Sequence, residues 1–179
     1  MALFVIIVMT SSVIGLMWGG SDDGNSIEYK NYKLIRQNNG QWMLNTEQGN
    51  LIFDYFPSEI EGLNFSGDIV QRTKTFEVDI TYDENSSFAE AMAYFQYMVE
   101  QNLGKSNVYV RKGFSAESSF NVPVITCKDA TSAVPVIYLK KAEKINVYLD
   151  GDCIIAEAGS EGDILKIKDW LVYSYLGVI

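Results

Sequence analysis

The sequence contains no histidine, and this absence removes several kinds of active site at once. Histidine is the base of Ser-His-Asp triads and Cys-His pairs and a common ligand of zinc. Acid–base chemistry in this chain would have to come from carboxylates, lysine or tyrosine. The chain also lacks a GxxxxGK[ST] phosphate loop, a G-x-G-x-x-G turn and an EF-hand loop. We therefore expect no cofactor and no metal, and a binding protein more readily than an enzyme.

Basic residues are scarce as well. Lysine and arginine total 14 against 23 aspartates and glutamates, which gives a net charge of −9. Proteins that bind nucleic acid through its phosphates need clustered positive charge, and so do proteins that adhere to anionic lipid. We therefore expect no nucleic-acid partner, and we attribute the acidic excess to solubility.

The longest apolar stretch lies at the start of the chain, over residues 2–18, and it carries no charge. A helix of this length spans about 25 Å, the lower limit for crossing a bilayer. The sequence has no basic residue before Lys30 and no A-x-A cleavage pattern, which argues against a signal peptide. We predict that residues 1–18 form an uncleaved transmembrane anchor. A cleaved signal peptide and a buried helix of the domain are the alternatives.

A polar linker is predicted over residues 19–28, which contain Asp22 and Asp23 but no basic residue. The positive-inside rule makes this flank the less favourable cytoplasmic one, so the domain is expected outside the cytoplasm. Residues 29–179 are enough for a single domain of about 150 residues with its own core.

The first part of this domain is predicted to be a β-meander. Asn38-Asn39-Gly40 is a strong turn signal, because Asn and Gly tolerate positive φ. Trp42 alternates with Leu44, which favours a core position over an exposed binding aromatic. The predicted strands are Tyr32–Arg36, Gln41–Asn45 and Leu51–Phe56.

The middle of the chain predicts a βαβ unit with parallel strands. A loop or short helical turn over Ser58–Ser66 precedes it. Phe76 begins an apolar alternation that predicts a half-buried strand with Phe76 facing the core. Ser87 and Glu90 have the spacing of a capping box, and Gly104 suits the left-handed end of a helix. The predicted elements are strand Thr75–Tyr82, helix Ser87–Leu103 and strand Ser106–Arg111.

The last third predicts a strand-rich region closed by a helix. Asp150-Gly151-Asp152 lies between two β-type runs and predicts a hairpin, with a Ca²⁺ site as the less favoured interpretation. The predicted elements are strands Val122–Cys127, Val134–Lys140, Ile145–Leu149 and Cys153–Glu157 and helix Gly162–Leu176, ended by Gly177. The fold class is therefore α+β, with a meander, a mixed sheet containing the βαβ unit, and a C-terminal helix.

The chain has two cysteines, Cys127 and Cys153. In an exported domain they most simply form a disulfide, which closes a loop of about 27 residues and stabilises by roughly 3–4 kcal/mol. Two free thiols in a cytoplasmic domain are the alternative, and the lack of a C-x-x-C motif argues against redox catalysis. Asn64 and Asn85 begin N-x-[ST] sequons and are candidate glycosylation sites.

Four acidic residues are the best catalytic candidates. Glu77 and Asp79 alternate on one face of a predicted strand, and Asp83 and Glu84 follow its end. A pair of carboxylates about 5 Å apart would suit a retaining glycosidase. A solvated strand face without catalytic function is the simpler interpretation.

Five short stretches scattered over the domain resemble a loose group of uncharacterised archaeal proteins. These proteins have one N-terminal hydrophobic helix followed by a small α+β ectodomain. The resemblance implies an anchor and a disulfide, and it supplies no catalytic residue. The stretches are Asn38–Trp42, Cys127–Thr131, Pro135–Ile137, Cys153–Ile155 and Tyr175–Val178.

The leading hypothesis is a membrane-anchored, extracytoplasmic domain that acts by binding or assembly. Its partners would be the membrane, through residues 1–18, and a protein or further copies of the chain. A carboxylate-dependent surface hydrolase is one alternative. A pilin-like filament subunit that packs through its N-terminal helix is another.

Overall fold

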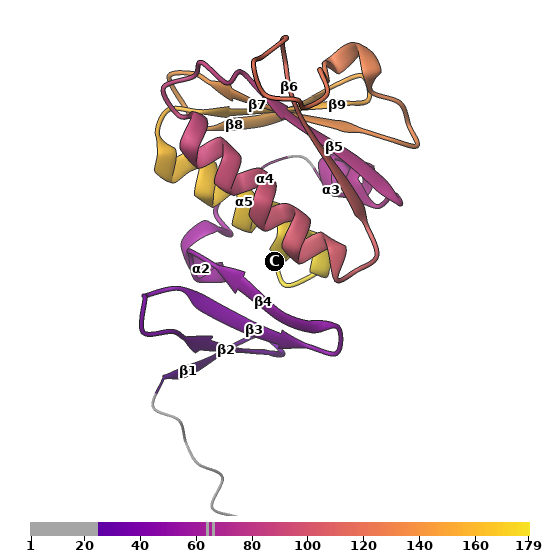
Figure 1. The fold of residues 1–179 in the computed structure, drawn as a ribbon. Coiled ribbons are helices and arrows are strands. Elements are labelled where there is room, and N and C mark those ends of the chain that lie inside the picture. Colours follow the sequence, from indigo (N-terminus) through magenta and orange to yellow (C-terminus); the bar gives the residue numbers. More distant parts are fainter. Residues whose placement is uncertain (1–24, 64, 66) are drawn as a thin grey trace, which may run out of the picture.

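The computed structural model describes residues 25–63, 65 and 67–179, which form three stacked layers (Figure 1). A five-stranded sheet and a four-stranded sheet form the outer layers, and two long helices lie between them. The predicted α+β class, with its meander, mixed sheet and C-terminal helix, is confirmed. The predicted anchor, 1–18, and residues 19–24 of the predicted linker lie outside the described residues. Within the described ranges, no helix is long and apolar enough to cross a membrane.

The four-stranded sheet is the predicted meander with one strand more. All neighbouring strands pair antiparallel, and Gly40 adopts φ +86° in the turn between β2 and β3. The extra strand, β1, takes residues 26–28 out of the predicted linker, because Ile27 pairs with Leu34 and extends the sheet edge. The strands are β1 (Ser26–Tyr29), β2 (Tyr32–Arg36), β3 (Trp42–Thr46) and β4 (Gly49–Phe53).

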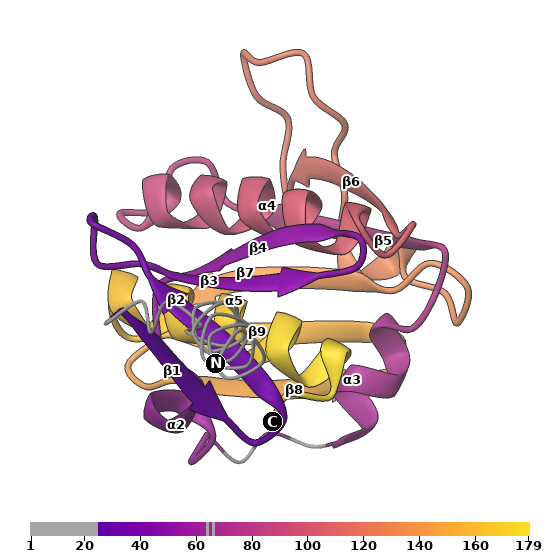
Figure 2. The same ribbon diagram turned by 90° about the horizontal axis from the view of Figure 1, so that it is seen from below.

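One face of this sheet packs on the helices, as Figure 2 shows from below. Trp42 is only 6% exposed, so its predicted core position is confirmed. Phe53 stacks on Tyr173 of the C-terminal helix with ring centroids 3.8 Å apart. Aromatic pairs of this kind add to the free energy gained by burying apolar area. The meander is therefore held to the helical layer by a continuous core.

The five-stranded sheet has the strand order β6-β5-β7-β9-β8. β5 pairs parallel with β6 across the α4 crossover, which confirms the predicted βαβ unit. β8 and β9 form the predicted antiparallel hairpin, with Gly151 at φ +62° in its turn. The strands are β5 (Glu77–Tyr82), β6 (Tyr109–Phe114), β7 (Val136–Lys141), β8 (Asn146–Asp150) and β9 (Cys153–Ala158).

The two long helices are α4 (Ala89–Gly104) and α5 (Glu161–Leu176). The Ser160 hydroxyl caps α5 by accepting a hydrogen bond from the Asp163 N–H at 3.2 Å. Gly177 ends α5 in the left-handed conformation, as predicted. Both predicted helices are confirmed, and each buries an apolar face in the core between the two sheets.

The predicted ends of α4 were wrong. Phe88 occupies the N-cap position without a side-chain cap, and the Ser87 hydroxyl accepts a hydrogen bond from Lys141 Nζ instead. At the other end Gly104 stays helical, and the left-handed residue is Asn107, with φ +61°. At the first end, the hydroxyl that was expected to cap the helix is bonded to β7, which lies 54 residues further along the chain.

Two short helices, α2 (Pro57–Ile60) and α3 (Gly67–Thr73), join the meander to the five-stranded sheet. The expected loop or short turn over Ser58–Ser66 corresponds to α2 and the residues after it, and α3 was not predicted. Ile69 and Val70 of α3 are buried in the main core. The helix therefore closes one side of the helical layer.

The segment between β6 and β7 is mostly irregular, and the predicted strand Val122–Cys127 is not formed. β6 continues to Phe114, beyond the predicted end at Arg111, and makes one isolated bridge to Val124. Pro123 has no N–H to donate to a longer ladder. The segment then turns into a single 3₁₀ turn, η1 (Cys127–Asp129).

Candidate functional site

The five-stranded sheet has one face turned away from α4 and α5, which we call the outer face. Val78, Ile80 and Tyr82 of β5 point into the main core, so Asp79 and Thr81 point to the outer face. Both are fully buried, and the segment that packs on this face of the sheet includes Ile125, Cys127 and Ala130. The expectation of a solvated strand face was therefore wrong.

Asp79 is not available as a catalytic acid or base. Arg111 Nε donates to Asp79 Oδ1 at 2.8 Å, and a second guanidinium nitrogen donates to Oδ2. These hydrogen bonds raise the pKa of Arg111 above its usual range. Glu77 lies beside the same guanidinium, with its Oε1 3.8 Å from Arg111 Nε. Glu77 and Asp79 thus share a face, as predicted, but they form one ion-pair group with Arg111.

The other two candidate acids lie beyond the end of β5. Asp83 is exposed, and its Oδ1 accepts a hydrogen bond from the Asn85 N–H at 2.9 Å. Asp83 is four residues from Asp79, roughly 13 Å along extended chain, which exceeds the carboxylate spacing of either glycosidase class. Asp83 lines a cavity of about 420 Å³ together with Lys140 and Lys141, with no second acid in its lining. Glu84 follows Asp83 and is partly buried. Glu77, Asp79 and Asp83 are therefore not assembled into a hydrolytic pair.

The other predicted sites lie at turns. Asn85 is exposed in the turn before α4, where a sequon can be reached, and Asn64 lies outside the described residues. Asp152 forms an ion pair with Arg72 at 2.7 Å, so the hairpin tip is satisfied by a protein cation. The described residues contain no group of three acidic, cysteine or histidine side chains placed to hold a metal.

The disulfide predicted between Cys127 and Cys153 is confirmed, with Cα atoms 5.2 Å apart. Cys153 begins β9 and is fully buried, whereas Cys127 lies in η1 and is partly exposed. The bond holds η1 against the outer face, above a small apolar cluster of Ile125, Val136 and Ile155.

Gly113 explains how closely this segment lies on the sheet. A Cβ at this position would lie 2.4 Å from the Pro123 carbonyl oxygen and 2.8 Å from the Ile125 side chain. No larger residue fits without moving the segment, so the bridge at Phe114 and the packing of Ile125 both depend on this glycine.

A cavity of about 310 Å³ opens beside the disulfide, which we call the Cys127 cavity. Tyr138 of β7 and Cys127 give it a mostly apolar wall. Thr126 hydrogen-bonds through its N–H and its hydroxyl to Asp129 Oδ2, at 2.8 and 2.9 Å, and these bonds lower the pKa of Asp129. The lining residues are Ser115, Thr126, Cys127, Lys128 and Tyr138.

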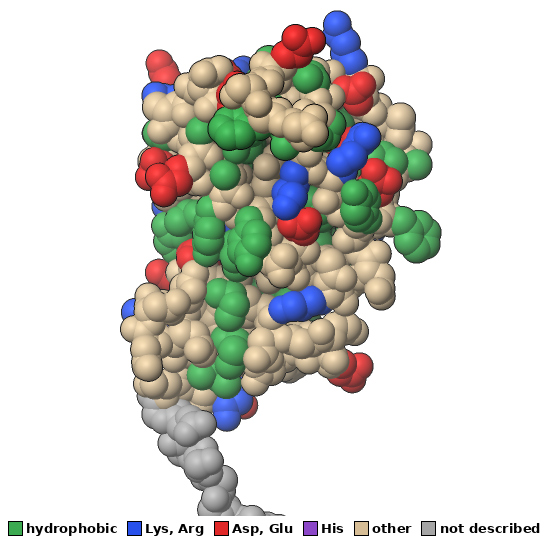
Figure 3. Space-filling model, viewed as in Figure 1, with side chains coloured by type: hydrophobic (Ala, Val, Ile, Leu, Met, Phe, Trp, Pro, Cys, Tyr) green, Lys and Arg blue, Asp and Glu red, His purple; other side chains and the backbone are tan. Residues whose placement is uncertain are grey.

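A second feature of the surface is two exposed aromatic residues at the beginnings of β5 and β6. Phe76 was expected in the core but is 90% exposed, because β5 begins only at Glu77. Tyr109 is 63% exposed and is joined to Phe76 through the backbone, since the Tyr109 N–H donates to the Phe76 carbonyl at 2.8 Å. In Figure 3 hydrophobic side chains reach the surface at the edge formed by β5 and β6. Three open cavities adjoin here and share Lys74.

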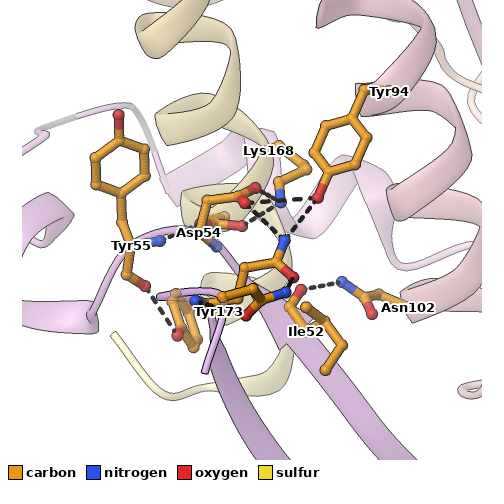
Figure 4. A network of polar contacts seen from close by, with 10 residues as sticks. Ile52, Asp54, Tyr55, Tyr94, Asn102, Lys168 and Tyr173 are labelled. Carbon is orange, nitrogen blue, oxygen red and sulfur yellow. Dashed lines mark hydrogen bonds and ion pairs between the residues drawn. The ribbon is translucent and has the colours of Figure 1, made fainter. Parts of the chain in front are cut away.

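A cluster of buried charges lies between the meander and the helices (Figure 4). The Lys168 Nζ is 2.8 Å from Asp169 Oδ1 and also pairs with Asp54. Asp169 Oδ2 accepts hydrogen bonds from the N–H groups of Asp54 and Tyr55 at 2.7 and 2.8 Å. β4 therefore ends at Phe53, before the predicted end at Phe56. The N–H groups of Asp54 and Tyr55 donate to a side chain of α5 instead of to a neighbouring strand.

Electrostatics in this cluster follow from burial. Burial acts to lower the pKa of Lys168, but the charges of Asp169 and Asp54 outweigh it and raise that pKa. Burial raises the pKa of Asp169 to about 6, although the positive charge of Lys168 acts to lower it. None of the five cavities described here is lined by these three residues. The cluster therefore joins the meander to the helical layer.

Comparison of the chain with protein-family models, with curated proteins and with solved structures found no match.

Proposed function

We propose that this chain is a membrane-anchored, extracytoplasmic binding domain whose ligand enters the Cys127 cavity. Residues 1–18 would hold it in the membrane, and the domain from β1 onward would lie outside the cytoplasm. The uncharged apolar stretch and the absence of nearby basic residues support this topology.

The disulfide is the observation that carries the proposal. Disulfides persist in oxidising compartments and are rare in the cytosol, so a Cys127–Cys153 bond supports an exported domain. The same bond fixes η1 over the outer face and places Cys127 in the wall of a cavity of ligand size. The carboxylate hydrolase has no comparable support, since Asp79 is buried and fully paired with Arg111.

The proposal is tested in cells that make the full chain. Free thiols are blocked with a maleimide at lysis, and the intact mass of the membrane fraction is read with and without reductant. We expect the chain in the membrane fraction with both thiols protected, and we expect protease added to intact spheroplasts to digest the domain.

A Cys127→Ser variant is the matched control, because it must show one blocked thiol at Cys153. A soluble chain with two blocked thiols would overturn the proposal, since it would place the domain in a reducing compartment. A membrane-bound chain whose domain resists external protease would overturn the proposed orientation.

A further inference from the structure

The size of the Cys127 cavity favours a small ligand. Its volume is about 310 Å³, and it is open to solvent on one side. This volume is at the lower end for ligand pockets in proteins. It suits a single ring or a short alkyl chain with one polar group.

The wall of the cavity favours an apolar body. Tyr138 and Cys127 both line it, and both pack against the apolar cluster of Ile125, Val136 and Ile155. Disulfide sulfur and aromatic carbon offer dispersion contacts and few hydrogen bonds. Binding of an apolar group against this wall is therefore favoured by the free energy of burying apolar surface.

The polar side of the cavity favours one negative charge. Among the described residues that line it, Lys128 alone is charged, and no ion pair of the described chain involves it. Ser115 also lines the cavity with its hydroxyl. Asp129, the adjacent carboxylate, accepts both donors of Thr126, its N–H and its hydroxyl. Lys128 is therefore free to pair with an anion, and the Ser115 hydroxyl can donate to the same anion.

A buried hydroxyl lies behind the same wall. Thr81 is fully buried on the outer face, and no hydrogen-bond partner for its Oγ1 is found among the described residues. Thr81 is the cross-strand neighbour of Tyr138, which lines the cavity. Buried hydroxyls usually have a partner, so a water molecule beside Tyr138 would be bonded here.

We infer that the Cys127 cavity binds a small carboxylic acid with an apolar body, such as an aryl or short branched alkyl carboxylate. The carboxylate pairs with Lys128 and accepts a hydrogen bond from Ser115, and the apolar body packs on Tyr138 and the disulfide. This inference rests on the proposed function, because it names the ligand class of the same cavity.

The test uses the full chain in detergent micelles and 4-fluorobenzoate as the probe, followed by ¹⁹F NMR, with empty micelles as the blank. We expect saturable broadening of the probe signal. The neutral isostere 4-fluorobenzamide should bind about tenfold more weakly, since it cannot form a charged pair with Lys128.

A Lys128→Met variant should bind 4-fluorobenzoate about tenfold more weakly and should no longer distinguish it from the amide. Lys144→Met is the matched control, because Lys144 is an exposed lysine in the loop between β7 and β8 and lines none of the cavities described here. We expect this control to bind as the native chain does.

Three results would overturn the inference. They are no saturable binding at millimolar probe, equal affinity for acid and amide, or equal weakening by Lys128→Met and Lys144→Met. The outcome is independent of the cellular test, since binding is measured on purified chain. Probe binding by a chain found in the cytosol would refute only the proposed location.

Discussion

Lys168 lies on the apolar face of α5, one turn from Ile164 and from Leu171, and its side chain is fully buried. This spacing is visible in the sequence, where a lysine interrupts a helical face that otherwise reads as core. The signal predicts a buried or paired charge at this position. Its partner Asp54 is not predictable, because it lies 114 residues away in a different layer.

Replacing Lys168 with methionine should lower the free energy of unfolding by roughly 3–5 kcal/mol, because Asp54 and Asp169 would keep buried charges without their cation. Urea denaturation measures the change. Lys166→Met is the control: Lys166 is partly exposed and pairs with Asp163 only at 3.8 Å, so we expect a change below about 0.5 kcal/mol. Equal effects of the two variants would contradict a special role for Lys168.

Asp169 should make stability depend on pH. Its pKa in the folded chain is about 6, above the value in the unfolded chain, so the folded state holds more protons between about pH 4 and 6. The free energy of unfolding of the native chain should therefore fall, relative to that of Asp169→Asn, as the pH rises through this range. Above about pH 7 the two should run parallel. Urea titrations at several pH values measure the difference, and a relative rise in the same window would show that Lys168 outweighs burial.

At the scale of the elements, the structure follows the sequence where the signals are local. The β8–β9 hairpin has its Asp-Gly turn at Gly151, and α5 ends at Gly177. Residues 122–127 have the apolar composition of a strand, but they are held by the packing of Ile125, the disulfide and a single bridge. The local sequence pattern does not distinguish a segment that packs on the face of a sheet from one that pairs at its edge. The conformation of this segment and the Cys127 cavity could therefore not be predicted.

Gly113→Ala should destabilise the chain by about 1–3 kcal/mol, because the added methyl group would meet the Pro123 carbonyl and the Ile125 side chain. Thermal unfolding measures this, and the exposure of Cys127 to reductant should increase with it. Gly104→Ala is the matched control in α4, where a Cβ would meet nothing within 4 Å. We expect that variant to be more stable by up to about 1 kcal/mol. If Gly113→Ala left the stability unchanged, the segment that contains Pro123 and Ile125 would have to move aside at little cost in free energy.

At the scale of the whole molecule, the order of the three layers was the least predictable feature. The meander and the βαβ unit each have their own sequence signals, but the packing of the first on the helices of the second depends on contacts such as Phe53 with Tyr173. The same limit explains Phe76 and Asp79. Alternation along β5 distinguishes its two faces, but only the arrangement of the layers decides that Asp79 is buried and that Phe76 is exposed among the described residues.

Phe53→Ala should test whether the layers unfold as one unit. Phe53 is fully buried between the meander and α5, and its loss should lower the free energy of unfolding by about 3–5 kcal/mol. We expect hydrogen exchange to speed up by the same factor in β3 and in β9, as two-state unfolding requires. Phe76→Ala, at an exposed aromatic, should leave both unchanged. Faster exchange confined to the meander would show that the layers open separately.

The position of β1 determines how the domain would respond to mechanical force. β1 is the edge strand of the meander and the first described element, so a pull from the proposed anchor reaches the domain through its four-residue pairing with β2. Such a load acts first on the hydrogen bonds between β1 and β2. The Cys127–Cys153 bond joins η1 to β9 in the five-stranded sheet, which is the layer opposite the meander. Tension from the anchor would therefore reach the wall of the Cys127 cavity only through the meander and the helical layer.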